Sequence, residues 1–179
     1  MGNAIVDMFR DAPMWQVYLV IFVVSMLPLI ELRGAVPIAA IFSQIFESAG
    51  QSFNMPLAYV IIIIGNMIPV PLIYFFARRV LEWGSDKPVI GKFFTFCLEK
   101  GHKGGEKLKA TAGKGLFVAL LLFVGIPIPG TGAWTGTLAA SILDMDFKSS
   151  VAAVILGVLL AGIIMSAVSF LGLGAILGF

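Results

Sequence analysis

The sequence predicts an all-α integral membrane protein built from two inverted repeats, each a re-entrant helical hairpin plus a transmembrane helix. Three observations support this fold class. Hydrophobic residues make up 59% of the 179-residue chain and charged residues only 12%, about half the charge of an ordinary soluble domain. Each half of the chain contains one hydrophobic stretch broken by prolines and glycines. A single strongly basic segment separates the two halves.

We expect one membrane domain over residues 1–179, with a first repeat at 1–77, a basic loop at 78–115 and a second repeat at 116–179. Cys97 and His102 are the only cysteine and histidine. A single cysteine cannot form an internal disulfide, and a single histidine argues against a zinc hydrolase site and Ser-His-Asp catalysis. We therefore expect a protein that is not an enzyme, needs no cofactor and binds no nucleic acid.

The first broken stretch reads SMLPLIELRGAVPIAAIF, from Ser25 to Phe42. The surrounding region, Met14–Phe46, allows one long broken span or a re-entrant hairpin. In the hairpin, half-helices at Met14–Leu27 and Ala35–Phe46 flank a turn at Glu31–Gly34. The second half-helix would be too short to cross a bilayer, so we favour the hairpin.

Glu31 and Arg33 are the only charged residues in this stretch. An ionisable side chain at membrane depth is costly and marks a functional site by default. In the functional interpretation, Glu31 takes up and releases protons while Arg33 tunes it or binds an anionic group. In the alternative, the two form a static ion pair that pins the turn. Gly34 belongs to the same expected site.

The apolar region Pro56–Ala77 is expected to span the membrane. It contains Asn66, followed by Pro69 and Pro71. An interhelical hydrogen bond is the expected role of Asn66, and contact with a substrate is the alternative.

The segment Arg78–Lys114 carries nine Lys and Arg residues against four acids. The positive-inside rule places it in the cytoplasm, with both chain ends on the opposite side of the cell membrane. Its middle part, PVIGKFFTFCLEK, has the pattern of an amphipathic helix at the membrane surface. We therefore expect a multi-pass protein of the cytoplasmic (inner) membrane.

The second repeat follows the same plan. Its broken stretch, Phe123–Leu143, is expected to turn through Pro127–Gly132, and Val151–Phe179 is the last span. Glycine lets backbone N–H groups point into a cavity, and a half-helix beginning near Ala133 would add a positive dipole end. Trp134 offers an aromatic face to an apolar or cationic substrate. The expected site residues here are Pro127, Pro129, Gly130, Thr131, Gly132, Trp134 and Thr135.

The two tips are expected to meet near the bilayer centre, because unpaired backbone groups need polar company that lipid cannot supply. The first tip brings charges, whereas the second brings N–H groups and hydroxyls.

Three motifs carry a resemblance: ELRGAVP, GNMIPVP and PIPGTGAWTG, in that order. Together they resemble the putative small multi-drug export protein family of prokaryotes, which implies drug efflux. The expected pair of opposed hairpins is also similar in architecture to the DedA/VTT superfamily, whose members are implicated in moving lipids and lipid phosphates. DedA proteins carry arginines in the second hairpin region, whereas GIPIPGTGAWTG has none. A phosphate clamp is therefore not carried over, and Arg33 remains the only cation in the two broken stretches.

The leading hypothesis is a secondary transporter that exports small amphipathic compounds in exchange for protons. A DedA-like lipid flippase or scramblase is the second hypothesis, and a non-transporting membrane assembly protein is the third. The expected partners are membrane lipids and a small-molecule or lipid substrate. A homodimer that covers the hairpins is the assembly we consider.

Overall fold

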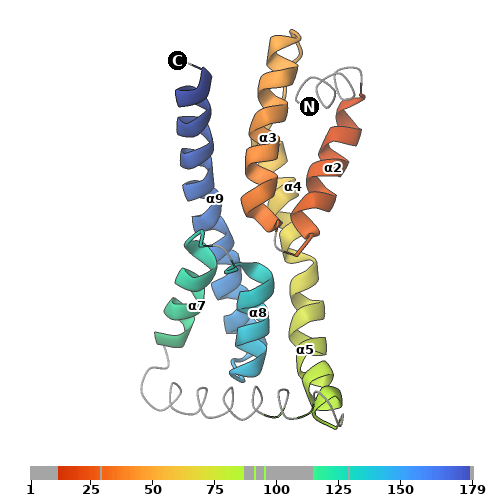
Figure 1. Cartoon of the computed structure of the whole chain (residues 1–179), viewed down its shortest axis with the longest axis vertical. Helices are drawn as coiled ribbons and strands as arrows, with labels where there is room; N and C mark the ends of the chain where they lie inside the picture. Colours follow the sequence, from red (N-terminus) through yellow and green to blue (C-terminus); the bar gives the residue numbers. More distant parts are fainter. Residues whose placement is uncertain are drawn as a thin grey trace. The chain divides into compact units, whose positions relative to one another are not determined.

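The computed structural model describes residues 12–28, 30–86, 115–128 and 130–177, together with Gly91 and Thr95. Every element within these residues is a helix, as the sequence predicts. The amphipathic helix expected over residues 88–100 lies almost entirely outside them. The helices are α2 (Met14–Met26), α3 (Glu31–Ser48), α4 (Met55–Met67), α5 (Pro69–Ser85), α7 (Gly115–Gly125), α8 (Ala133–Ile142) and α9 (Phe147–Leu177) (Figure 1).

Two helical stretches among the described residues are long and apolar enough to cross a membrane, Met55–Phe76 and Phe147–Ser169. Only a third of each is buried in the protein. Apolar side chains dominate the rest, as in Ile163, which is 70% exposed. A helix with apolar residues on its exposed face is typical of a membrane environment. Both stretches agree with the predicted spans, and α5 continues as a helix to Ser85. The predicted loop boundary at Arg78 stays a prediction.

The first span is interrupted near its middle. α4 ends at Met67 and α5 begins at Pro69. Proline fits the first turn of a helix, where an N–H group has no intrahelical partner, but it ends the helix that precedes it. Pro69 and Pro71 therefore divide one apolar run into two helices.

The chain forms two compact units, Met1–Asn66 with Ala161–Phe179 and Met67–Leu160. The first contains α2, α3, α4 and the end of α9. The second contains α5, α7, α8 and the start of α9. Each unit thus holds one helix pair and part of each candidate span, and a helix pair followed by a candidate span occurs twice along the chain.

In the first unit, α2 and α3 pack side by side, so the chain reverses between them (Figure 1). The chain reverses between Met26 and Glu31, and the prediction of a turn at Glu31–Gly34 is wrong, because these residues form the first turn of α3. α3 is also longer than the predicted half-helix. Its 18 residues correspond to about 27 Å at 1.5 Å per residue. How the pair lies in the membrane stays a prediction.

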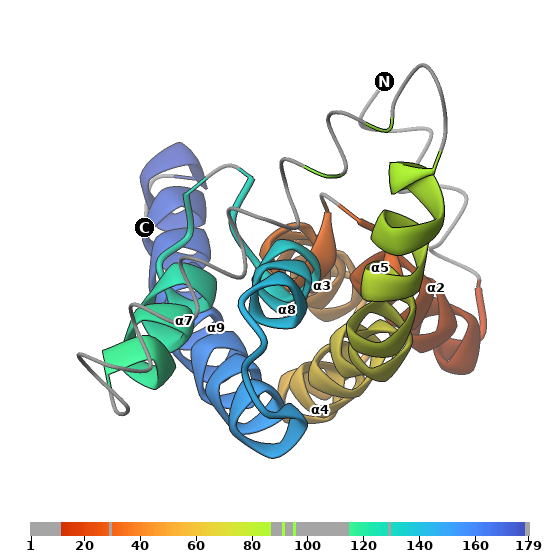
Figure 2. The ribbon, with the colours of Figure 1, turned by 90° about the horizontal axis from the view of Figure 1, so that it is seen from below.

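In the second unit, the reversal between α7 and α8 falls over residues 126–132, where the Pro and Gly residues predict it. α8 packs against both α7 and α5 (Figure 2). The hydroxyl of Ser141 donates to the carbonyl oxygen of Tyr74 at 2.8 Å. The Tyr74 hydroxyl in turn donates to the carbonyl oxygen of Met145. These bonds fix the C-terminal end of α8 to α5.

The same close contact recurs in both units, between the first helix of each pair and a glycine of the candidate span that follows the pair. A Cβ on Gly65 of α4 would lie 2.1 Å from the Ser25 Oγ and 2.8 Å from the Phe22 carbonyl oxygen of α2. A Cβ on Gly157 of α9 would lie 2.7 Å from the Val124 Cβ and 2.8 Å from the Leu121 carbonyl oxygen of α7. In both cases the contacted residues are three apart. Small residues of this kind let helix backbones approach closely.

Candidate functional site

The first candidate site lies where α3 begins. Glu31 is only 5% exposed, and its φ of 50° is unusual for a residue with a side chain. Its N–H donates to the carbonyl oxygen of Leu27 at 3.0 Å, which closes the turn from α2. A left-handed backbone at a non-glycine residue costs on the order of 1–3 kcal/mol. The fold therefore holds a buried carboxylate in a strained conformation at the N-terminus of a helix, where the dipole favours negative charge.

Arg33 lies one half-turn further along α3 and is half-buried. Its guanidinium interacts electrostatically with Glu31. Pro37, four residues later, cannot donate to the Arg33 carbonyl, which removes one helical hydrogen bond at this end of α3. Gly34 lies close to Ile30, because an added Cβ would be 2.3 Å from the Ile30 Cγ2. The three residues predicted from the first motif are thus together in one helical turn.

The second candidate site is the turn between α7 and α8. Gly130 and Gly132 have φ values of 84° and 153°, which other residues rarely adopt. The Thr131 hydroxyl lies 2.9 Å from the Ile128 carbonyl oxygen and 3.1 Å from that of Ile126. Because a hydroxyl has one proton, Thr131 uses it to hold the turn and keeps only its lone pairs for a substrate. Pro129 lies outside the described residues.

Past this turn, α8 begins at Ala133 with no side-chain cap, and the Gly136 N–H donates to the Gly132 carbonyl oxygen at 2.8 Å. Trp134 and Thr135, both predicted site residues, are half-buried on the first turn. The Thr135 Oγ1 is buried and has no hydrogen-bond partner. The same is true of Thr137, which is fully buried and which the sequence pattern did not single out. Unpaired buried hydroxyls are rare in folded proteins.

Asn66 lies on α4 near the middle of the 22-residue span Met55–Phe76. It is 1% exposed, and its Oδ1 accepts no hydrogen bond. The interhelical hydrogen bond expected from the sequence is therefore missing at this oxygen. Asn66 and Glu31 belong to the first unit, whereas the turn around Thr131 belongs to the second. The expectation that the two tips meet stays a prediction.

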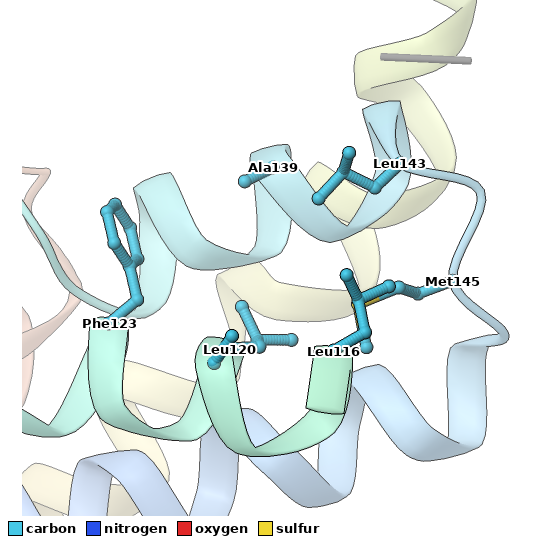
Figure 3. A pocket seen from close by; sticks show the side chains of 7 residues that line it. Leu116, Leu120, Phe123, Ala139, Leu143 and Met145 are labelled. Carbon is cyan, nitrogen blue, oxygen red and sulfur yellow. The ribbon is translucent and has the colours of Figure 1, made fainter. Parts of the chain in front are cut away.

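An apolar pocket of about 200 Å³ lies between α7 and α8 in the second unit. Leucines of α7 face the C-terminal half of α8 across it, Phe123 lies at one end, and Met145 closes part of the other (Figure 3). Sequence analysis could not find it, because each lining residue alone is an ordinary apolar membrane residue. The lining residues are Leu116, Ala119, Leu120, Phe123, Ala139, Leu143 and Met145.

Comparison with protein families identifies a matching family model. The family described as "Putative small multi-drug export protein" matches residues 31–164 of the 179. This range begins at Glu31 and includes Asn66, the turn around Thr131 and the first part of α9. No curated protein and no solved structure matches the chain.

Proposed function

The chain belongs to the putative small multi-drug export protein family, and we propose that it is a membrane transporter that exports small amphipathic compounds in exchange for protons. The observation that carries this proposal is the buried, conformationally strained Glu31 beside Arg33 at the start of α3. Ionisable residues at such positions in transporters mark substrate and proton pathways. The family description supports export, and the chemistry of Glu31 suggests how it is driven.

Glu31 has the properties that a coupling carboxylate needs. Its burial removes it from bulk water, so that its protonation responds to the local charge rather than to solvent. Arg33 favours the ionised form of Glu31, and a conformational change that moves Arg33 away from Glu31 would favour the protonated form. A proton could then be exchanged for a substrate at one position. The strained backbone of Glu31 gives the turn a second conformation to relax into.

We propose that α2–α3 and α7–α8 are re-entrant hairpins of two inverted repeats, with the transport site between their tips. The recurring helix order and the matching contacts of Gly65 and Gly157 support an internal repeat. The unpaired hydroxyls of Thr135 and Thr137 support a polar role for α8. The apolar pocket between α7 and α8 would suit the apolar part of an amphipathic compound.

The orientation that we propose has residues 78–115 in the cytoplasm and both chain ends outside, as the lysine and arginine distribution indicates. Single cysteines introduced at Asn3 and Gly105 in a Cys97→Ser background test it with a membrane-impermeant maleimide on intact cells. Labelling at position 3 and protection at position 105 are expected. Labelling from outside at position 105 would contradict the orientation.

The proposed function is tested with purified protein in proteoliposomes that carry a pH-sensitive dye inside. Addition of an amphipathic substrate should cause proton flux that depends on the protein and on the proton gradient. A parallel assay with fluorescent phospholipids measures headgroup translocation without a gradient. Lipid translocation without substrate-dependent proton flux would replace the exporter with a DedA-like lipid flippase. If folded protein shows neither activity, a role in membrane assembly would remain.

A further inference from the structure

The middle of the first span gathers hydrogen-bond acceptors without matching donors. The Oδ1 of Asn66 is buried and has no hydrogen-bond partner. At the centre of a membrane span, lipid cannot donate the missing bond. A packing role alone would not need an amide here, because an apolar residue of similar size packs equally well.

The neighbouring carbonyl group is a second acceptor. In a regular helix, the carbonyl oxygen of Gly65 accepts a bond from the N–H of the residue four positions later. That residue is Pro69, which has no N–H. Pro69 thus removes the usual helical donor of the Gly65 carbonyl, and the next residue is Asn66, whose side-chain Oδ1 has no hydrogen-bond partner.

A third oxygen lies against Gly65. The Ser25 Oγ of α2 is so close that an added Cβ on Gly65 would be 2.1 Å from it. Ser25 is fully buried, and its hydroxyl proton is donated to the carbonyl oxygen of Phe22 at 2.7 Å. Only the lone pairs of its oxygen remain for further bonds. Ser25 therefore adds an acceptor near Gly65 and cannot add a donor.

The second unit provides the comparison. Gly157 makes the same close contact with α7 that Gly65 makes with α2, but the next residue is Val158, which is also 1% exposed. α9 is continuous past this point and contains no proline. The close helix contact therefore does not require a polar residue after the glycine. The hydrogen-bond acceptors at Gly65 and Asn66 are a feature that the contact at Gly157 lacks.

We propose that Asn66, the Gly65 carbonyl and Ser25 bind the protonated amino group of an amphipathic amine, which names the substrate class of the transporter proposed above and rests on that function. An ammonium group carries up to three N–H donors and no acceptor. Bonds from a charged donor are about twice as strong as neutral ones.

The test measures equilibrium binding of tritiated phenethylamine to the full-length protein in lipid nanodiscs, with no gradient present. The substitution Asn66→Val copies the residue that the chain itself has at position 158, so the fold should persist, as checked by circular dichroism and gel filtration. It should weaken binding at least tenfold, whereas Asn66→Asp should strengthen it, because a carboxylate attracts the ammonium group more strongly. The N-trimethyl analogue, which has the charge but no N–H donors, should compete at least tenfold more weakly.

Unchanged affinity of folded Asn66→Val would overturn the inference, as would equal competition by the trimethyl analogue or the absence of saturable binding to the wild-type protein. Because no gradient is used, the outcome is independent of proton coupling. If Asn66→Val leaves amine binding unchanged and the protein still transports amphipathic compounds, the amine site is wrong and the proposed function stands. If the protein binds the amine at this site but transports nothing, the site stands and the proposed function is wrong.

Discussion

The side-chain hydroxyl of Ser141 donates a 2.8 Å hydrogen bond to the main-chain carbonyl oxygen of Tyr74. This bond connects α8, the helix after the second turn, to α5, the second half of the first span. Ser141 is 6% exposed, so water does not compete for its hydroxyl group. Hydrogen bonds therefore hold α8 near both of its ends. Thr131 bonds within the turn before the helix, and Ser141 bonds to α5 near the end of the helix.

The substitution Ser141→Ala should lower the stability of the protein by about 0.5–1.5 kcal/mol, the usual net worth of one intramolecular hydrogen bond. The apparent melting temperature in detergent measures the change. Ser85→Ala is the matched control, because Ser85 is less buried and bonds only to Glu82 within its own helix. Equal effects of the two substitutions would show that the bond to Tyr74 contributes nothing specific.

Alanine at Gly65 or Gly157 should destabilise the protein by about 1–3 kcal/mol, because the new methyl group would meet backbone oxygen atoms 2.8 Å away that cannot move aside. Gly162→Ala is the control on α9. Its Cβ would meet nothing closer than 3.6 Å, so it should be neutral or slightly stabilising through the better helix propensity of alanine. Thermal unfolding in detergent compares the three. A tolerated alanine at both crowded positions would contradict the close contacts.

The hydroxyl of Thr131 should contribute more to the stability of the protein than its methyl group does. Thr131→Ser keeps the bonds to the Ile126 and Ile128 carbonyl oxygens and should retain near wild-type stability. Thr131→Val keeps the shape and loses the bonds, at a cost of about 1 kcal/mol. Limited proteolysis of the α7–α8 turn and thermal unfolding measure the difference. If the serine variant is the less stable of the two, the turn is held by packing instead.

Removal of the Arg33 charge alone should destabilise the protein more than removal of the Glu31 and Arg33 charges together. Arg33→Gln leaves the buried carboxylate without its cation and should destabilise the protein by roughly 1–3 kcal/mol, less than for a fully buried pair because Arg33 is only half-buried. The double variant Glu31→Gln with Arg33→Gln should recover most of this loss. Additive losses in a double-mutant cycle of melting temperatures would argue against coupling between the two side chains.

Sequence patterns predict the second turn better than the first, for a local reason. At residues 127–132, proline and glycine impose the backbone conformation themselves. In the first stretch, Gly34 attracts the turn prediction, yet its N–H makes a helical bond to the Ile30 carbonyl oxygen. The residue that adopts the left-handed conformation is Glu31, against its local preference. Sequence rules for single residues do not anticipate a left-handed glutamate, because only a few per cent of non-glycine residues have a positive φ.

Only part of the candidate site can likewise be predicted from the sequence. Glu31, Arg33 and Asn66 are polar residues within apolar runs and can be found from sequence. The unpaired state of Asn66, the buried Thr137 and the apolar pocket depend on which residues the neighbouring helices bring close. The role of the Thr131 hydroxyl in its own turn likewise follows from the positions of two carbonyl groups that the sequence does not specify.

The central claim is that Glu31 couples transport to protons, and the effect of Glu31→Gln on substrate-driven proton flux tests it most directly. Flux is measured in proteoliposomes over external pH 5.5 to 8.5, with Glu47→Gln on the exposed end of α3 as the matched control. We predict that Glu31→Gln folds and binds substrate but gives no proton flux at any pH, whereas Glu47→Gln behaves like the wild type. Full, pH-dependent flux in the Glu31→Gln variant would contradict the claim and leave Glu31 with a purely structural role.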